Sequence, residues 1–345
     1  MEEKVIKNDV KVKPKKNPKD KLFKLDRQPL IISSSPHLNT TDSVPKIMWT
    51  VIIALLPAVV LSIYYFGLPA LWMMSTCVIS AGLAECLMNK LKGEEFTIPD
   101  GSAVITGLLL AMTLPPSFTL TSAIIGTVFA IVIGKHIFGG LGFNIFNPAL
   151  LGRAFLQACF PVAITTWTFP KTDVYLSKIV DGVTAATPLG LFKFEGETSD
   201  LFNMFWGNIG GSLGETSAIS IIIGGGFLLI KKYADWRIPV SYLGTVFLFG
   251  AIMWWINPKY PDPTFHLLSG GLMLGAFFMA TDMVTSPITP KGAWIFGIGA
   301  GILLVVIRLF GGLPEGVMYS ILLMNAVTPL INRYTRPKFF GEGSK

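Results

Sequence analysis

Residues 102–114, which read Ser-Ala-Val-Ile-Thr-Gly-Leu-Leu-Leu-Ala-Met-Thr-Leu, form an apolar run that stops at Pro115 and Pro116. A helix needs about 20 mostly apolar residues to cross a bilayer, so this run is too short to span one comfortably. Irregular backbone at membrane depth is tolerated only where protein or a water-filled cavity satisfies its polar groups. The stretch therefore predicts a broken or re-entrant element inside a polytopic membrane protein.

The composition of the whole chain agrees with a membrane protein. Hydrophobic residues make up 51% of its 345 positions and charged residues 14%, whereas globular proteins contain about 25% charged residues. The net charge of +7 is concentrated at the N-terminus, since residues 1–28 hold nine lysines and one arginine against five acids. This distribution predicts a solvated basic tail and argues against a nucleic-acid-binding surface.

Nine further apolar runs accompany the one at residues 102–114, so the sequence predicts about ten transmembrane helices. These runs are 46–66, 69–89, 119–138, 149–167, 216–231, 238–256, 265–284, 292–310 and 315–332. The longest break between them, residues 168–215, predicts a loop outside the membrane.

The third and eighth runs resemble each other. Residues 107–113, Gly-Leu-Leu-Leu-Ala-Met-Thr, are similar to residues 275–281, Gly-Ala-Phe-Phe-Met-Ala-Thr, and residues 147–150 are loosely echoed by 325–329. The matching elements are five helices apart, an odd number, so they cross the membrane in opposite directions. Inverted repeats with interrupted helices form the central site of many transport proteins. We therefore expect an all-α polytopic membrane protein with two inverted five-helix repeats; chance similarity among apolar residues is the alternative.

Five segments follow from this organisation. They are a basic tail (1–40), a first transmembrane half (41–167), an extracytoplasmic loop (168–215), a second transmembrane half (216–335) and a C-terminal tail (336–345). Short cytoplasmic loops carry an excess of lysine and arginine. The basic residues within 90–92, 231–237 and 333–338, together with the predicted loop residue Lys135, therefore predict that both termini are cytoplasmic and that the 168–215 loop lies on the opposite side.

Three ionisable residues lie within or beside predicted spans, where charge is costly and marks candidate functional sites. Glu85 is a candidate for an ion path, or lies near the membrane interface beside a loop lysine. Asp282 either serves an ion or a flavin edge or caps a broken helix; its hydroxyl-bearing neighbours are Thr281, Thr285 and Ser286. Arg153, on residue type alone, favours an interfacial anchor or a helix-end partner. The cysteines and histidines have no spacing typical of zinc or haem ligands.

The 168–215 loop contains the sequence Asp181-Gly182-Val-Thr184-Ala-Ala186-Thr187. Small and hydroxyl-bearing residues of this kind are typical of an ordinary turn. They also match the flavinylation motif Asp-x-x-Ser/Thr-Gly-Ala-Thr, except that Ala185 stands where the motif has glycine. Residues 144–155 and 278–287 look like further family signatures. On these stretches the chain resembles the RnfD components of the Rnf ion-translocating ferredoxin:NAD+ oxidoreductase complexes, and more distantly the NqrB components of the Na+-translocating NADH:quinone reductases.

The resemblance implies the cofactors. In that family a dedicated transferase esterifies the phosphate of FMN to the last threonine of the motif, here Thr187, and a second, non-covalent flavin (riboflavin) lies among the helices. The expected cofactor-binding residues are Thr187, Asp181, Gly182, Thr184, Ala186, Asn147, Arg153, Thr281, Thr285 and Ser286. Glu85 and Asp282 are the ion-path candidates. No catalytic residue and no resident metal are expected.

The resemblance also implies a function. It describes a membrane electron-transfer subunit of an ion-pumping ferredoxin:NAD+ oxidoreductase, inactive alone, in which Na+ or H+ is moved. Expected partners are the other Rnf subunits, above all an extracytoplasmic FMN-bearing one, an FMN transferase, and the bilayer of a bacterial inner membrane, but no nucleic acid. The alternatives are a component like NqrB of the quinone reductase, a non-redox solute or ion transporter on the same inverted-repeat fold, and a structural scaffold. Absence of flavin from the purified chain would favour the transporter.

Overall fold

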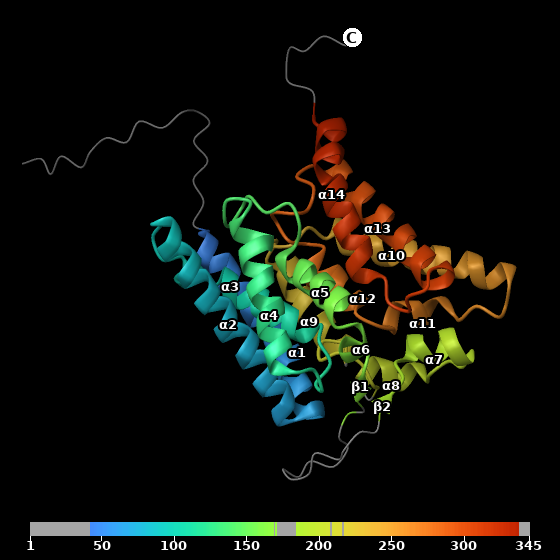
Figure 1. The fold of residues 1–345 in the computed structure, drawn as a ribbon. Coiled ribbons are helices and arrows are strands. Elements are labelled where there is room, and N and C mark those ends of the chain that lie inside the picture. The colour runs from blue at the N-terminus through green and yellow to red at the C-terminus, as the bar shows by residue number, and fades with distance from the viewer. Residues whose placement is uncertain (1–41, 169, 171–183, 208, 216, 338–345) are drawn as a thin grey trace, which may run out of the picture. The chain divides into compact units, whose positions relative to one another are not determined.

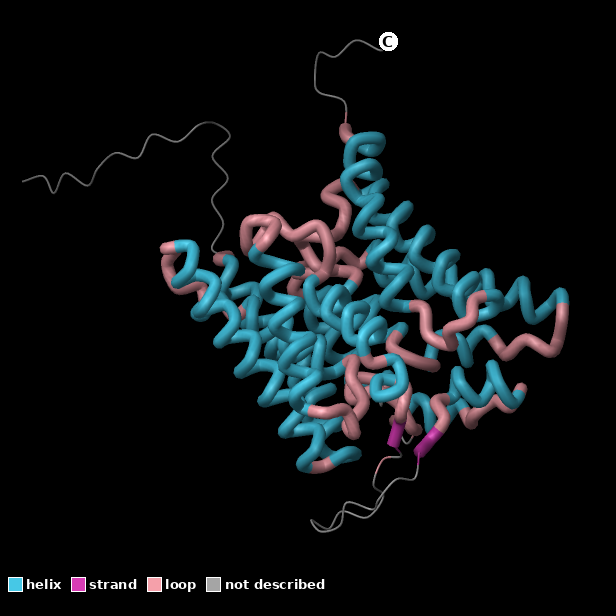
Figure 2. The backbone as a smooth tube through the Cα atoms, in the orientation of Figure 1, coloured by secondary structure: helices cyan, strands magenta, loops and turns pink. Residues whose placement is uncertain are grey.

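The computed structural model describes residues 42–168, 170, 184–207, 209–215 and 217–337, without the side chains of Thr184 and Ala185. Contacts divide the chain into two units, Met1–Thr41 and Asp42–Lys345. All described residues belong to the second unit, and Figure 2 shows that helices make up most of it.

The first half of this unit contains five main helices. They are α1 (Val44–Phe66), α2 (Leu68–Lys92), α3 (Ser102–Met112), α4 (Leu120–Ile131) and α5 (Pro148–Cys159). A 3-10 turn, η2 (Ile98–Asp100), precedes α3, and a π-helical turn, η3 (Val132–His136), extends α4. The long apolar run 46–89 is divided at Gly67, whose φ of 68° favours glycine. Within this described half, α1 and α2 are long and apolar enough to cross a membrane.

The second half has the same order of main helices, but the counterpart of α3 is divided into α11, α12 and η4. Its elements are α9 (Ala218–Ile230), α10 (Arg237–Ile256), α11 (Pro263–Leu268), α12 (Leu272–Leu274), η4 (Gly275–Met279), α13 (Pro290–Phe310) and α14 (Val317–Thr335). The apolar run 265–284 is therefore not a continuous helix. It is broken between α11 and α12, where Gly270 has a φ of 65° and the side chains of Leu189 and Arg308 occupy the space of a β-carbon.

The 168–215 stretch contains more structure than a loop. Two short strands, β1 (Trp167–Thr168) and β2 (Thr184–Ala185), pair antiparallel and are followed by α7 (Pro188–Glu195) and α8 (Leu201–Trp206). The predicted helix over 149–167 ends early because Pro161 cannot continue α5 and instead begins α6 (Pro161–Ile164). Figure 1 shows α6, α7, α8 and both strands at one end of the unit, away from the C-terminal end of α14.

The two halves are built in the same way. α2 packs on α3 and α4, and α4 packs on α5; correspondingly, α10 packs on α11 and α13, and α13 packs on α14. In Figure 1, α1–α4 gather on one side and α10, α13 and α14 on the other, with α5 and α9 between them. The counterpart helices α1 and α9 contact each other, as do α5 and α14. The predicted all-helical polytopic membrane fold with interrupted helices is confirmed.

The two interrupted helices end inside the protein, and protein groups satisfy their final carbonyls. Beyond α3, the carbonyl of Met112 accepts from Gly214 N at 2.6 Å, and that of Thr113 accepts from the guanidinium of Arg153. At the end of η4, the carbonyl of Met279 accepts from Asn147 Nδ2 at 3.2 Å. Buried backbone groups need such partners, so the broken ends are stable at membrane depth.

Candidate functional site

Thr187 lies at the start of α7, where it is the N-cap residue. Its backbone is extended (φ −67°, ψ 156°) and its Oγ1 accepts a hydrogen bond from Gly190 N at 3.1 Å. The side chain is buried, with 5% of the residue exposed. Of the other motif residues, Ala186 is exposed, Thr184 pairs through its backbone with Thr168, and Asp181 and Gly182 lie outside the described residues. The motif threonine therefore stands at the positive end of a helix dipole.

α7 is fastened to the second half. The amine of Lys193 donates to the carbonyls of Arg308 (3.1 Å) and Leu313 (3.0 Å) and to that of Gly311. Partial burial lowers the pKa of this amine below its usual value, because desolvation disfavours the charged form. Leu189 belongs to a small apolar cluster with residues of α8, α11 and the segment between α8 and α9. These contacts place the last turn of α7 beside the C-terminal end of α13.

A pocket opens near the N-terminal end of α1, and its space unfilled by protein atoms, about 810 Å³, includes space open to solvent. Its walls include Ile47 and Met48 of α1, Ser102 at the start of α3 and Lys135 in η3. Three residues predicted at functional positions, Asn147, Thr281 and Asp282, line it. Thr285 and Ser286 follow in the chain but are not part of its lining.

The pocket lies at the opposite end of the unit from α7 and α8. α1 runs between the two ends, since Ile47 lines the pocket while Tyr65 donates from its hydroxyl to the carbonyl of Trp206 in α8 at 2.9 Å. The helix rises about 1.5 Å per residue, so its 23 residues span about 35 Å. The structure therefore separates Thr187 from Asn147, Thr281 and Asp282.

Several predicted site residues hold the backbone in place. Asn147 caps α5, accepting from Ala149 N at 3.0 Å, while its amide nitrogen binds η4 as described above. Asp282 accepts from Thr285 Oγ1 at 3.1 Å and from Val284 N at 3.4 Å, which is the capping arrangement considered for it. Thr281 Oγ1 donates to the carbonyl of Phe277 at 2.6 Å. Each of these contacts shapes the pocket wall.

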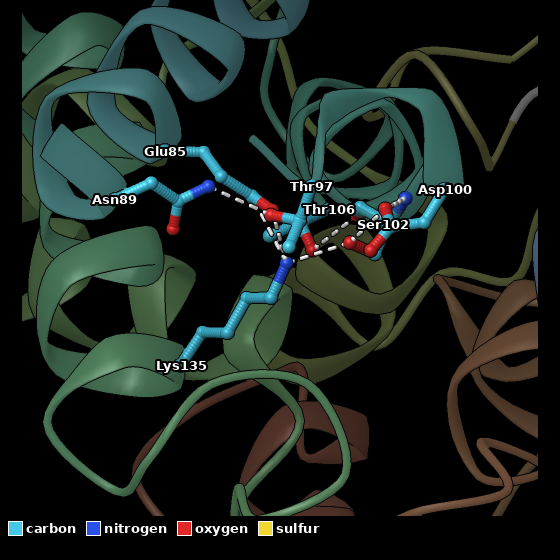
Figure 3. A network of polar contacts seen from close by, with 7 residues as sticks. All are labelled: Glu85, Asn89, Thr97, Asp100, Ser102, Thr106 and Lys135. Carbon is cyan, nitrogen blue, oxygen red and sulfur yellow. Dashed lines mark hydrogen bonds and ion pairs between the residues drawn. The ribbon is translucent and has the colours of Figure 1, made fainter. Parts of the chain in front are cut away.

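Glu85 is buried in a polar network next to this pocket (Figure 3). Lys135 Nζ lies 2.8 Å from both carboxylate oxygens of Glu85 and donates to Ser102 Oγ at 2.6 Å. Thr97 Oγ1 also donates to Glu85, at 2.5 Å, and accepts from Asn89 Nδ2 at 2.9 Å. The side chains of Lys135 and Glu85 are 4% and 0% exposed. Glu85 is therefore one half of a buried ion pair.

Sequence reasoning missed Lys135, which it treated as a loop lysine that reports orientation. The signal was present, since Lys135 follows an apolar stretch directly and Glu85 lies within another. A buried charge requires a partner, so two opposite charges in neighbouring spans could have been paired. Sequence reasoning also missed Glu315, which is the ion-pair partner of Arg153.

Arg153 does not lie in the large pocket. Its guanidinium binds the carbonyl of Thr113 and forms an ion pair with Glu315. This is the helix-end role that its residue type favoured, at the junction of α3 and α5. Within the described ranges, no group of three or more histidine, cysteine, aspartate or glutamate side chains is placed to hold a metal ion.

Comparison with known proteins gives a consistent assignment. The model of the NQR2, RnfD, RnfE family matches residues 31–341. The D subunit of the proton-translocating ferredoxin:NAD(+) oxidoreductase complex of Clostridium ljungdahlii is 49% identical over 90% of this chain and 96% of its own length. The D subunit of the Na(+)-translocating ferredoxin:NAD(+) oxidoreductase complex of Acetobacterium woodii is 46% identical over 90% and 95%. The D subunit of the ion-translocating oxidoreductase complex of Stutzerimonas stutzeri is 41% identical over 88% and 94%.

Both findings extend over nearly all of the chain and include the main helices of both halves, the interrupted ones among them. The chain therefore belongs to the NQR2, RnfD, RnfE family.

Proposed function

We propose that this chain is the membrane electron-transfer subunit of an ion-translocating ferredoxin:NAD+ oxidoreductase complex and carries FMN as a phosphoester on Thr187. The observation that carries the proposal is the motif ending in Thr187 at the N-terminus of α7. The names of the relatives support the reaction, and their near-complete overlap with this chain supports a role as one subunit of a larger complex.

The N-terminus of α7 suits a phosphate. The first N–H groups of a helix lack intrahelical partners, and the helix dipole favours negative charge there. Thr187 Oγ1 already accepts from Gly190 N, so an ester phosphate at this oxygen would find the same backbone donors. The flavin, when bound, supplies one- and two-electron transfer. Because Thr187 is buried, the transferase would act before the first turn of α7 docks, or on a conformation in which it is released.

The large pocket is the site that we propose for the second, non-covalent flavin. Phe278, Leu109 and Val51 provide apolar walls, and Asn147 and Thr281 provide amide and hydroxyl groups within them. An apolar cavity with a few converging polar groups is the usual form of a cofactor site. In this proposal Thr281 and Asn147 orient the flavin ring, and Lys135, which is paired with Glu85, forms part of the pocket wall. Glu85 and Asp282, on the same side, are proposed to face the ion path.

The orientation that we propose in the membrane assigns a side to each end of the unit, the end with the large pocket and the end with α7. The basic residues flanking α2, α9 and α14 support a cytoplasmic location for the end with the large pocket. Thr187 would then face the other side of a bacterial inner membrane, where a neighbouring FMN-bearing subunit exchanges electrons with it. An FMN transferase is the partner required for maturation, since a threonine hydroxyl is a poor nucleophile without activation.

Denaturing gel electrophoresis tests whether FMN is attached covalently to Thr187. The chain is produced with an active FMN transferase, denatured and inspected for flavin fluorescence in the band. We expect fluorescence in the wild type and in Thr187→Ser, which keeps a hydroxyl, and none in Thr187→Ala. Thr165→Ala, which removes an exposed hydroxyl before the strands, should stay fluorescent. A dark wild-type band beside a fluorescent control substrate would contradict the proposal and favour a non-redox transporter.

A further inference from the structure

The short helix α8 presents an aromatic face that the described part of the protein leaves uncovered. Phe202 and Trp206 are 67% and 48% exposed, Leu201 is also exposed, and Phe205 is half-buried. Successive residues of a helix are about 100° apart, so these four side chains lie within an arc of about 140°. The ring centroid of Trp206 lies 6.2 Å from that of Phe202 and 6.2 Å from that of Phe205. We call these four residues the α8 face.

The other side of α8 is packed against the protein. Met204 is fully buried and belongs to the apolar cluster that contains Leu189 of α7 and Phe265 of α11. The carboxylate of Asp200 caps the helix by accepting from Phe202 N at 3.4 Å. Because these contacts fix one side of α8, the α8 face is directed away from the protein.

α8 lies at the level at which α1 leaves the membrane. The hydroxyl of Tyr65, one residue before the end of α1, donates to the carbonyl of Trp206 at 2.9 Å. α1 is long and apolar enough to cross a membrane, and its length of about 35 Å slightly exceeds the hydrocarbon core of a bilayer, about 30 Å. Its end therefore lies near the boundary between hydrocarbon and headgroups, and so does α8.

Neighbouring spans expose aromatic side chains at this same end of the unit. Tyr64 near the end of α1, Trp72 near the start of α2 and Trp255 near the end of α10 are all exposed. Tyrosine and tryptophan are enriched where a membrane meets water, because their rings are apolar and their edges polar. The α8 face therefore extends an aromatic belt that the spans form at this end.

The charges beside the α8 face argue against attraction to anionic lipid. Glu195, Glu197 and Asp200 precede the face and are exposed, and residues 194–230 contain no lysine or arginine. Interfacial helices bind a bilayer through buried apolar area and through attraction of basic residues to anionic headgroups. Here only the first of these contributions is available, so a zwitterionic bilayer suits the α8 face.

We propose that the α8 face inserts into the interface of the lipid bilayer and makes α8 an interfacial anchor. Its continuity with the exposed ends of α1, α2 and α10 favours lipid over a protein partner as its cover. Leu189, which shares the apolar cluster with Met204, lies two residues after Thr187, so the anchor holds Thr187 near the membrane surface. The consequence for a flavin on Thr187 rests on the proposed function, whereas insertion does not depend on flavin.

Spin labels on the purified full-length chain in phosphatidylcholine vesicles measure the depth of α8. The label is placed at Phe202→Cys after Cys86 and Cys159 are replaced by alanine, and its collisions with oxygen, which concentrates in the bilayer, are compared with those with a water-soluble nickel chelate. Leu248→Cys, exposed in the middle of α10, should collide mainly with oxygen, and Glu197→Cys, exposed before α8, mainly with nickel. We expect an oxygen-to-nickel ratio at Phe202→Cys between those of the two controls.

Leu201→Cys, at a second exposed position of the α8 face, should give a similar ratio and provides the test if Phe202→Cys does not fold. Added phosphatidylglycerol should leave both ratios unchanged. A ratio at both positions equal to that of Glu197→Cys would overturn the proposal and favour a protein partner as the cover, and insertion that requires anionic lipid would overturn it too. Since no flavin is used, these results are independent of the fluorescence at Thr187.

Discussion

The ion pair between Glu85 and Lys135 joins α2 to η3 and is nearly inaccessible to solvent. Removing one partner of such a pair leaves an uncompensated charge and costs about 3–5 kcal/mol, whereas replacing both can be nearly neutral. We therefore expect Lys135→Met to lower the thermal midpoint of unfolding strongly, and Glu85→Gln combined with Lys135→Met to restore most of it. Unfolding of the detergent-solubilised chain, followed by circular dichroism, measures this.

The matched control is the pair formed by Arg237 and Asp235, whose side chains are 32% and 34% exposed. Exposed pairs contribute no more than about 1 kcal/mol, so Arg237→Met should change the midpoint little. If Lys135→Met and Arg237→Met lower the thermal midpoint equally, the buried ion pair stabilises the fold no more than the exposed one does.

Residue type alone could predict that Glu85, Arg153 and Asp282 need special surroundings, because charge at membrane depth requires a partner. It could not predict the partners. Lys135 lies 50 positions from Glu85, and Glu315 lies 162 positions from Arg153. Such contacts depend on how helices pack, which a single sequence does not contain. The prediction that Thr187 carries flavin came from a short motif and stays a prediction.

At the scale of elements, one side chain connects α7 to the end of α13 by hydrogen bonds. Lys193 joins it to three carbonyls at and beyond the end of α13, and a hydrogen bond from a charged donor contributes about 1.5–3 kcal/mol. Lys193→Met should therefore loosen α7, and its amides should exchange hydrogen at least about tenfold faster, since about 1.4 kcal/mol corresponds to a factor of ten. Hydrogen–deuterium exchange followed by mass spectrometry measures the rate.

Lys259→Met replaces an exposed lysine in the loop after α10 and should leave exchange in α7 unchanged. Unchanged α7 exchange in Lys193→Met would show that the apolar cluster around Leu189 holds the helix by itself.

The elements predicted most closely are the long apolar helices. Predicted runs at 46–66, 238–256 and 292–310 became Val44–Phe66, Arg237–Ile256 and Pro290–Phe310. α7 and α8 were missed, because six or eight residues are too few for hydrophobic periodicity to show. The break between α11 and α12 was missed because two glycines among apolar residues read equally well as helix–helix packing.

At the scale of the whole molecule, the halves meet where α1 crosses α9 at Gly224. A β-carbon there would lie 2.0 Å from the carbonyl oxygen of Ala54, a backbone atom that cannot move aside alone. Gly224→Ala should therefore separate the halves and cost about 1–3 kcal/mol through overpacking. The thermal midpoint of the purified chain should fall accordingly.

Gly226 lies on the same helix, and no atom lies within 4 Å of the place that a β-carbon would take there. Because alanine favours helix over glycine by up to about 1 kcal/mol, Gly226→Ala should leave stability unchanged or raise it. A fall in both variants would show that the effect is not specific to the contact between α1 and α9.

The inverted repeat could be predicted from short sequence similarities between the two halves. One pair of similar segments lies where the halves contact each other. The echo of residues 147–150 by 325–329 places Asn147 and Asn325 at the contact of α5 with α14. With its amide oriented to satisfy both neighbours, Asn325 accepts from Asn147 N at 3.2 Å. What the sequence could not show is that this contact also includes the carbonyl of Met279, because no local pattern encodes a bond across 132 positions.

The attachment of α7 to α13 has a mechanical consequence. α7, which Thr187 caps, is attached to the second half, whereas Ser102 and Lys135 of the large pocket belong to the first. A small rotation of one half against the other would lengthen or shorten the route between two flavins at these positions. Electron flow would then report the relative position of the halves, and an ion that stabilises one position would regulate that flow without touching either flavin.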